Sequence, residues 1–428
     1  MIVFLKKVRV NTVFSAFEPV ITEPLELCYL KATLDQMNAE SYIIDELFSL
    51  KEPANQVPDA VVLTGYNVSE NEIINNADFY KIKFPQAAII VGGVHVQGNA
   101  PLFHQESIDY VCHTQSLETF KCIIENIMNK NNGIVDGADY YDRQNNKWHQ
   151  SNKKTVFEKE NITPDRSIFK AYFKKLRYLE KNNVALIKGS IGCPYNCSYC
   201  YCKMINSGRY VRAVYKEILA ETKDIPADYF WIVDDVLFAS RKGALEFIEA
   251  VSVNPLKLKI IAYLRADFIL KEKDLLPLLK EAGLSEVIVG FETFSNDELK
   301  EYEKTTNALD YPQVINVLRE NKIDLTALFM VKPEYGIKDF WNLYKFIKTN
   351  NIDVYTVSIL TPIKGTKDYD KLKDRLTKMD PKKFDFLHLV LKPNLPPWLF
   401  YMLFYGIHIR LLKSKRIWKY LLNAWREI

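Results

Sequence analysis

Apolar runs alternate with helix-length amphipathic segments along the first 130 residues. Short strand-like runs occur at 2–5, 42–44, 60–64, 87–91 and 108–111, and helical patterns occur at 24–37, 69–83 and 116–128. Strands separated by helices of this length form βαβ units, which give a mostly parallel sheet covered on both faces. The pattern therefore predicts an α/β fold that begins with a doubly wound, Rossmann-like sheet over residues 1–132.

Six further strand-helix repeats follow in the second half of the chain. Their strands are expected at 184–188, 229–233, 258–262, 286–290, 325–329 and 354–358. Six such units make three quarters of a TIM barrel. We therefore expect a partial (β/α)6 barrel over 183–375, after a linker at 133–182 with a hairpin or surface excursion near 145–154. A helical region at 376–428 completes the chain.

Composition bounds the class of protein. The 428 residues exceed what one core usually supports, and a net charge of +4, spread along the chain, gives no reason to expect nucleic acid. Of the seven cysteines four are scattered, and residues 1–5 are too short an apolar run for a signal peptide. These features predict a protein of the reducing cytoplasm.

Three cysteines lie within eight residues in the run Gly192-Cys-Pro-Tyr-Asn-Cys-Ser-Tyr-Cys. Thiolates at Cys193, Cys197 and Cys200 can bind three irons of a cubic iron-sulfur cluster and leave the fourth iron open to another ligand. The alternative is a zinc site, which needs four tetrahedral ligands. The chain has no second C-x2-C or H-x3-H pair, so zinc would have to recruit the nearby Cys202.

The C-x3-C-x2-C spacing, with Tyr199 before its last cysteine, resembles the motif of the radical S-adenosylmethionine (SAM) superfamily. The resemblance implies a 4Fe-4S cluster bound by Cys193, Cys197 and Cys200, with SAM on the open iron. It also implies an external one-electron reductant such as flavodoxin or ferredoxin.

Residues 1–132 resemble the cobalamin-binding domain that precedes the barrel in one large radical SAM class. Pro24-Leu-Glu-Leu-Cys-Tyr-Leu30 stands where these proteins have an opening motif, and Gly92-Gly93-Val94-His95 matches a later Gly-Gly-x-His. Parallel sheets bind ligands at the carboxyl ends of their strands, so Thr64, Gly65, Gly92 and Gly93 are the expected contacts of the cofactor. His95 is either a cobalt ligand or a histidine bonded within its own loop.

Two departures from the class concern cofactor binding. Glu26 occupies the usual place of a glycine, and 113–116 replaces a Gly-Glu-Gly-Glu turn.

Residues at the ends of other barrel strands also resemble members of the superfamily. The resemblance implies that Glu292 pairs with the amino group of SAM and that Arg265 binds its carboxylate. Asp234 is expected to face the SAM ribose or to order its loop. The alternative for each is a helix cap or a surface ion pair.

The tail is rich in aromatic and basic residues, from Pro396 through Lys419, but its apolar run is shorter than the ~17 residues that span a membrane. We expect it to cap the open side of the barrel. The alternative is an amphipathic helix on an anionic membrane, a peripheral contact that would suit a lipid substrate.

The sequence as a whole predicts a radical SAM enzyme with cobalamin that methylates an unactivated carbon of a small-molecule, natural-product or lipid substrate. Two alternatives stay open. One is a radical rearrangement, cyclisation or dehydrogenation without methyl transfer, and the other is a zinc-bearing scaffold protein.

Overall fold

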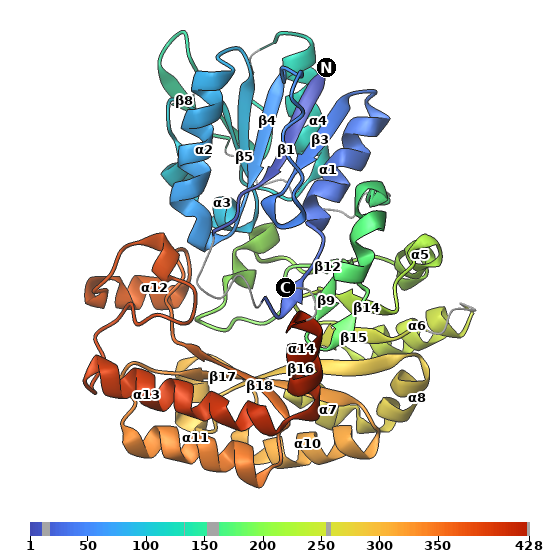
Figure 1. Cartoon of the computed structure of the whole chain (residues 1–428), viewed down its shortest axis with the longest axis vertical. Helices are drawn as coiled ribbons and strands as arrows, with labels where there is room; N and C mark the ends of the chain where they lie inside the picture. The colour runs from blue at the N-terminus through green and yellow to red at the C-terminus, as the bar shows by residue number, and fades with distance from the viewer. Residues whose placement is uncertain (11–17, 132, 152–161, 254–257, 426–428) are drawn as a thin grey trace.

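The computed structural model describes residues 1–10, 18–131, 133–151, 162–253 and 258–425. An N-terminal sheet domain stands on the second domain, a half-open barrel of parallel strands, and the C-terminal helices lie against the side of that barrel (Figure 1). This arrangement confirms the predicted α/β fold class.

The N-terminal sheet has seven strands in the order β3-β1-β4-β5-β6-β7-β8. The first five are parallel: β3 (Glu40–Ile44), β1 (Ile2–Lys7), β4 (Ala60–Thr64), β5 (Ala88–Gly92) and β6 (Tyr110–Cys112). The chain winds outward from β1 in both directions, so the switch point of the sheet lies between β1 and β4. Ligands of doubly wound sheets bind beside such a point.

Alternating side chains of these strands pack against helices on both faces. Val3 and Leu5 belong to one core with α1 (Leu25–Gln36) and α4 (Leu117–Met128). Phe4 belongs to a second core, with α2 (Glu70–Lys83) and α3 (Val94–Asn99). The sequence predicted α1, α2 and α4 to within a residue or two at each end.

A hairpin extends this sheet beyond the predicted strands. Strands β7 (Ala138–Asp142) and β8 (Lys147–His149) pair antiparallel, and β7 pairs antiparallel with β6. The hairpin expected near 145–154 thus forms around its turn at 143–146 and belongs to the sheet, although residues 152–161 lie outside the described ranges.

The second domain contains a six-stranded parallel sheet in strictly sequential order. Its strands are β11 (Val184–Ile187), β14 (Tyr229–Ile232), β15 (Ile260–Tyr263), β16 (Leu284–Glu292), β17 (Asp324–Val331) and β18 (Val354–Ile359). The helices outside them are α5 (Tyr215–Ala220), α6 (Arg241–Ser252), α7 (Ala266–Lys271), α8 (Leu276–Glu281), α9 (Asn296–Glu301), α10 (Tyr311–Glu320) and α11 (Ile337–Thr349). All six predicted strands are present, as a (β/α)6 barrel requires.

The amino-terminal end of the barrel is closed by side chains that fill its interior. Val184, Ile261 and Ile288 pack on Tyr178 of a small sheet whose order is β10-β9-β2. Its strands are β2 (Val20–Ile21), β9 (Arg177–Tyr178) and β10 (Lys181–Asn182). Beside them, the fully buried Glu286 accepts from Lys181, 2.6 Å away. The open mouth is therefore the opposite, carboxyl-terminal end.

The free edge of β11 is capped by two buried charged side chains. The Glu23 carboxylate accepts the Leu186 N–H (2.9 Å), and the Arg166 guanidinium donates to the Leu186 carbonyl (2.7 Å). An unpaired strand edge buried without partners would be costly. This pair, 143 residues apart in the sequence, ties both sides of the domain junction to the first barrel strand.

The tail forms α13 (Pro397–His408) and α14 (Lys415–Trp425), after the short α12 (Lys367–Leu372). Phe400 packs edge-on against Phe340 of α11, and the Tyr355 hydroxyl of β18 donates to the Ile407 carbonyl (2.6 Å). Helix α13 thus covers the side of the barrel, as the capping interpretation expected. Among the described residues, no helix has the length and apolarity to cross a membrane.

Candidate functional site

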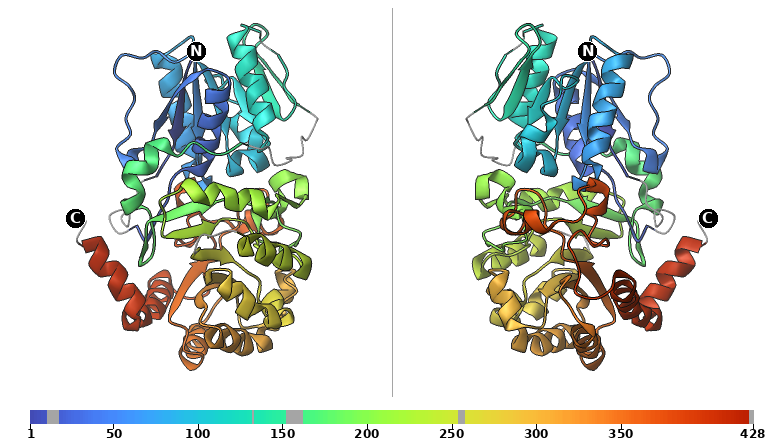
Figure 2. Two further views of the ribbon diagram at one scale, coloured as in Figure 1. Left: turned by 90° about the vertical axis from the view of Figure 1, so that its right-hand side faces the viewer. Right: turned by 90° about the vertical axis from the view of Figure 1, so that its left-hand side faces the viewer.

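The carboxyl edge of the N-terminal sheet faces the mouth of the barrel. Two asparagines bridge the domains: Asn67 Nδ2 donates to the Phe384 carbonyl (2.8 Å), and Asn99 Nδ2 donates to the Lys364 carbonyl (3.3 Å). Both follow strands of the N-terminal sheet, and both acceptors lie beyond β18. Figure 2 shows the two domains stacked in this way from both sides.

The cysteine loop lies at this mouth, between two short strands that close its base. Strand β12 (Ser190–Ile191) pairs antiparallel with β13 (Val211–Arg212). Gly192, with φ of +76°, turns the chain where a Cβ would collide with the Arg209 carbonyl. The buried Asp234 carboxylate accepts the Gly189 N–H at 2.7 Å. Asp234 therefore fixes the chain just before β12, and its role toward the SAM ribose stays a prediction.

Cys193, Cys197 and Cys200 are free thiols, each partly exposed on this loop. Between them, the fully buried Ser198 donates its N–H to the Tyr302 carbonyl (3.0 Å), which fixes the middle of the loop against the barrel. Burial raises the pKa of Cys193 to about 11 and also raises that of Cys197. Both thiols must therefore lose a proton when they bind iron.

This donor set fits a cluster better than a single ion. The described residues bring no three His, Cys, Asp or Glu side chains around one point, as zinc requires. An iron-sulfur cluster instead takes one cysteine for each iron, so its ligands stand apart. Cys202 is buried. Its thiol forms a hydrogen bond with the Cys200 sulfur, and this hydrogen bond lowers the pKa of Cys200. Cys202 thus stabilises the position of the predicted ligand Cys200.

Glu292 is the last residue of β16, at the bulged end of the strand, and faces the same loop. Its carboxylate accepts from the Tyr199 hydroxyl (3.0 Å) and from Lys304 Nζ (2.8 Å). Burial, with the adjacent Glu292, raises the pKa of Tyr199, so its hydroxyl remains a donor. Glu292 has φ of +63°, a strained backbone conformation for a non-glycine residue, and such strain gathers at functional sites. The carboxylate expected to receive the SAM amino group thus already holds one ammonium group.

Lys304 was not identified from the sequence, because it belongs to no motif and lies twelve residues after Glu292. A second donor bond, to the Gly290 carbonyl (2.8 Å), holds it in place. A Cβ on Gly290 would collide with the Glu292 carboxylate. The glycine in this motif therefore makes room for the carboxylate and its cation.

Arg265 lies on the other side of the cysteine loop. It binds Asp267 with two nitrogens (2.9 and 2.7 Å), and its Nη2 also donates to Thr305 (2.8 Å). Its guanidinium stacks on Tyr195, between the first two cluster cysteines, with 3.7 Å to the ring centre. Its role toward a SAM carboxylate stays a prediction, and in this structure it braces the loop.

The predicted glycines of the N-terminal domain divide into two kinds. Gly65 is buried, and a Cβ there would press on Ser69 and Ile73, so it serves the packing of α2 on the sheet. Gly93, with φ of +113°, turns the chain where a Cβ would lie 2.9 Å from the Thr64 hydroxyl. Gly92 and Gly93 are partly exposed at the carboxyl edge of the sheet.

His95 lies in an ion-pair network between the domains. Its Nε2 is 2.8 Å from the Glu70 carboxylate, which also accepts from Lys364 of the barrel (2.7 Å). Burial alone would raise the pKa of Glu70, but the bonds from His95 and Lys364 hold it below its ordinary value. The ring is 6% exposed and its Nδ1 faces Asn99. This network, which the sequence did not reveal, holds His95 in place, and its role toward cobalt stays a prediction.

Met204 of the cysteine loop forms a further contact of this junction. It lies so close to Gly98 of α3 and Gly365 beyond β18 that a Cβ on either glycine would collide with its side chain. The cluster loop, the N-terminal domain and the last barrel loop therefore meet at one methionine.

The switch point of the N-terminal sheet carries charged and aromatic side chains. Lys7, at the end of β1, pairs with Glu26 and lies 4.3 Å from the centre of the Tyr66 ring. Burial alone would raise the pKa of Glu26, but the Lys7 ammonium holds it below its ordinary value. Tyr66 is 59% exposed. Glu26, noted as a departure, is thus half of an ion pair beside the expected cofactor face.

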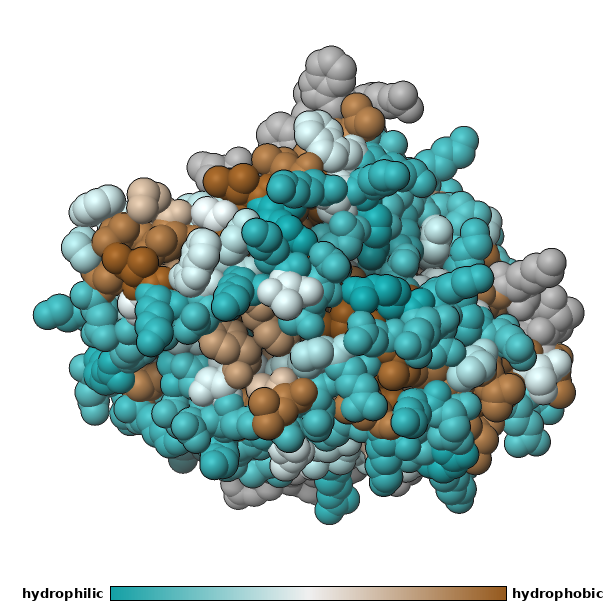
Figure 3. All heavy atoms as spheres, turned by 90° about the horizontal axis from the view of Figure 1, so that it is seen from below, coloured by the Kyte–Doolittle hydropathy of each residue, from teal (hydrophilic) through white to brown (hydrophobic). Residues whose placement is uncertain are grey.

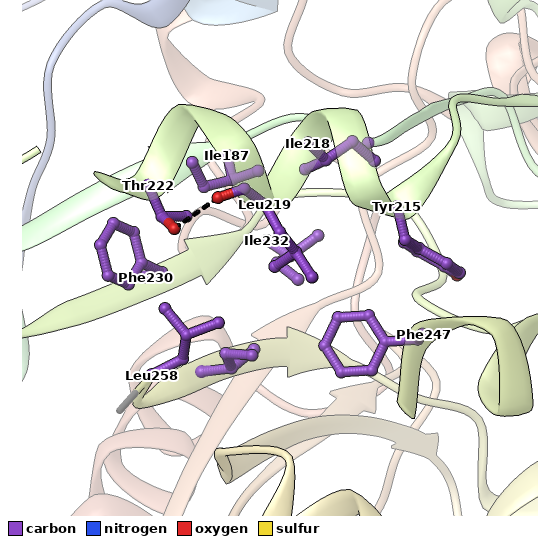
Figure 4. Close-up of a pocket in the computed structure, with 11 residues that line it drawn as sticks. Ile187, Tyr215, Ile218, Leu219, Thr222, Phe230, Ile232, Phe247 and Leu258 are labelled. Atoms are coloured by element: carbon purple, nitrogen blue, oxygen red, sulfur yellow. Dashed lines mark hydrogen bonds between the residues drawn. The ribbon is translucent and has the colours of Figure 1, made fainter. Parts of the chain in front are cut away.

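One small apolar cavity, of about 10 Å³, lies in the outer layer of the barrel and borders Gly189 (Figure 4). It is enclosed between Ile218 of α5, Phe247 of α6 and outward-facing strand residues such as Ile232. A space of this size is a packing gap in the outer layer of the barrel.

A sequence comparison identifies the second domain. The family model of the radical SAM superfamily matches residues 187–347, which hold the cysteine loop and β14 to β17. This part of the chain is therefore similar to the radical SAM superfamily, the family that the cysteine motif indicated.

Several curated relatives match at low identity. The hopanoid C-3 methylase of Methylococcus capsulatus is 24% identical over 212 residues, covering 50% of this chain and 41% of the relative. The bacteriochlorophyllide d C-12(1)-methyltransferase of Chlorobaculum tepidum is 28% identical over 211 residues (47% and 46%). The anaerobic magnesium-protoporphyrin IX monomethyl ester cyclase of Synechocystis is 23% identical over 363 residues (80% and 70%). The chain thus spans under half the length of the first two relatives.

Two solved structures share the whole arrangement. TsrM from Kitasatospora setae, a radical SAM methyltransferase with cobalamin and a 4Fe-4S cluster bound, superposes with a TM-score of 0.68 at 14% identity, covering 94% of this chain and 81% of TsrM. OxsB, a cobalamin-dependent SAM radical enzyme with aqua-cobalamin and SAM bound, gives 0.65 at 19% identity (92% and 57%). At these identities the likeness establishes the fold. This chain therefore shares the two-domain fold of TsrM and OxsB.

Proposed function

We propose that this chain is a cobalamin-dependent radical SAM enzyme that methylates an unactivated carbon atom. The observation that carries the proposal is the position of the cysteine loop, at the barrel mouth and directly below the carboxyl edge of the N-terminal sheet. A cofactor on that edge would lie beside both the cluster and the substrate.

The residues have separate roles in this proposal. Cys193, Cys197 and Cys200 hold the cluster, which supplies the electron for reductive cleavage of SAM. Glu292 accepts the SAM amino group in place of Lys304, because both are ammonium groups and the carboxylate lies beside the loop. The N-terminal domain excludes water from the mouth and holds cobalamin at Gly92 and Gly93.

The substrate we propose is a small molecule or lipid with an extended carbon skeleton. Relatives of this chain are named for a hopanoid, a bacteriochlorophyllide and a magnesium-protoporphyrin ester. The reductant is a separate one-electron donor, such as flavodoxin or ferredoxin, and we place the enzyme in the cytoplasm, where thiols remain reduced.

The test is cofactor and product analysis of the full chain, reconstituted without oxygen. We expect about four irons and four sulfides per chain, a visible spectrum of bound cobalamin, and formation of both 5'-deoxyadenosine and S-adenosylhomocysteine when SAM, reductant and substrate are present. An iron-free protein would refute the proposal, and one zinc per chain would indicate the scaffold instead. Deoxyadenosine alone, without bound cobalamin, would assign the chain to radical chemistry without methyl transfer.

A further inference from the structure

The C-terminal helices carry an apolar stripe that faces away from the barrel. Its residues recur at spacings of three and four along α13 and the following turn, so they share one helix face, and they are 46 to 69% exposed: Trp398, Met402, Tyr405, Ile409 and Leu412. The opposite face, with Phe400, Phe404 and Ile407, is buried on the barrel. A helix that is apolar all round is normally buried all round. Capping the barrel therefore accounts for only half of α13.

Helix α14 continues this surface with lysines among its apolar residues. Lys415, Trp418, Lys419 and Leu422 lie at spacings of three and four and are all exposed. Arg416 turns inward instead and binds Glu286 at 2.8 Å, below the closed end of the barrel. This buried ion pair determines which face of α14 looks outward. Figure 2 shows α14 at the outer margin of the molecule.

The charge of the chain is concentrated in the same segment. Residues 386–425 contain six Lys or Arg and no Asp or Glu, whereas the remaining residues contain 51 basic and 53 acidic ones. Lys413, Lys415 and Lys419 are exposed and form no ion pair with any described residue. The whole net positive charge of the protein therefore belongs to the tail.

Apolar patches occur elsewhere, for example on the underside of the barrel (Figure 3). The tail differs from such patches because its apolar stripe is accompanied by basic residues and by no acidic residue within 386–425. Lysine is depleted at the centre of protein interfaces. At a membrane surface, by contrast, tryptophan lies at headgroup depth while lysine reaches the anionic headgroups. With twelve residues, α13 is about 18 Å long and can only lie in the plane of a bilayer.

We propose that the outward face of α13 and α14 docks on an anionic lipid bilayer. Trp398, Ile409 and Trp418 enter the interface, and Lys413, Lys415 and Lys419 bind its phosphates. This surface lies outside the cysteine loop and its partners, so the proposal is independent of the reaction that the enzyme catalyses.

The test is co-flotation of the reconstituted full chain with vesicles of phosphatidylcholine, with or without phosphatidylglycerol. We expect binding to the anionic vesicles that weakens as salt rises.

Trp398→Glu with Ile409→Glu should lower this binding at least ten-fold. Lys415→Gln with Lys419→Gln should lower it roughly five-fold per lysine, on anionic vesicles alone. Two apolar residues elsewhere that are even more exposed, changed as Ile82→Glu with Leu309→Glu, provide the control, which should bind normally.

Deoxyadenosine formation without vesicles reports that each variant is folded. Absence of binding by the unaltered chain would overturn the proposal, and so would binding that the tail substitutions leave unchanged. Equal binding to neutral vesicles would remove the role of the lysines. A dimer in solution that the Trp398 and Ile409 substitutions dissociate would show that the stripe joins two copies of the chain instead.

Discussion

At the scale of single residues, the space around one glycine controls a charged site. Gly290 has no side chain, and a Cβ there would meet the Glu292 carboxylate and come within 3.2 Å of Lys304. Glu292 itself has a left-handed backbone, which most side chains avoid. The position of this carboxylate thus depends on two unusual features of its own strand.

Glu292→Gln is expected to weaken SAM binding about ten-fold or more, because a charge-assisted hydrogen bond is lost. Gly290→Ala should have a similar effect by displacing the carboxylate. Gly406→Ala is the matched control, since a Cβ there meets nothing within 4 Å. Equilibrium binding of SAM to the reconstituted proteins measures all three. Unchanged affinity in Glu292→Gln would exclude this carboxylate as the partner of the SAM amino group.

Substitution should distinguish the cysteines of the loop that bind iron from Cys202, which does not. Cys197→Ala is expected to abolish deoxyadenosine formation, because one iron loses its protein ligand. Cys202→Ala should retain most of it, because the buried Cys202 thiol forms hydrogen bonds with the Cys200 sulfur and with Asp235 and is not one of the three predicted ligands. Iron content and deoxyadenosine are measured together. Cleavage by Cys197→Ala would remove the cluster assignment.

At the scale of elements, α13 ends in a histidine whose environment favours the neutral ring. His408 Nδ1 lies 3.0 Å from the Phe404 carbonyl, where a protonated nitrogen donates to it. Burial lowers the pKa of His408 below 6.5. The unfolded chain therefore takes up this proton at a higher pH than the folded chain does.

The stability of the protein should accordingly fall as the pH is lowered through 6.5, since the unfolded state binds more protons there. The contribution of His408 is present above pH 6.5 and is lost as the pH falls below the pKa of the folded state. Denaturant unfolding at pH 7.5 and 5.5 measures the slope, and His408→Gln should reduce it. An identical slope in the variant would show that His408 is not the group responsible.

At the scale of the whole molecule, function depends on how the two domains meet. Glu70 of the N-terminal domain, 8% exposed, binds Lys364 of the barrel, and Met204 fits between Gly98 and Gly365. These contacts connect the expected cofactor face to the last barrel loop. They do not touch the cluster ligands.

Glu70→Gln or Lys364→Met is therefore expected to leave deoxyadenosine formation nearly unchanged and to lower S-adenosylhomocysteine formation about ten-fold, because methyl transfer requires alignment of the domains. In a double-mutant cycle on unfolding, the pair should couple by about 1–2 kcal/mol. Lys242→Met, which breaks an exposed pair within α6, is the control. Equal loss of both products would indicate a general defect in folding.

Much of this fold could be predicted from the sequence because its signals are local. The period of apolar residues identified the six barrel strands, and β4 (Ala60–Thr64) matches its predicted bounds. The sequence left two alternatives for the β7–β8 segment, a hairpin or a surface excursion. Its short strands are specified by pairing with β6 rather than by their own pattern. The cysteine motif was readable because its ligands are neighbours in the chain.

Tertiary structure alone decided the partners of these groups. Lys304 beside Glu292, Lys364 beside Glu70 and Arg166 beside Leu186 are each joined by folding across the sequence, and no local pattern encodes such pairs. The same holds for the outward face of α13, because apolar residues surround that helix and only its packing on the barrel selects which ones remain exposed. The period of the apolar residues determines where helices and strands form. The packing of the whole chain determines which partner each side chain meets.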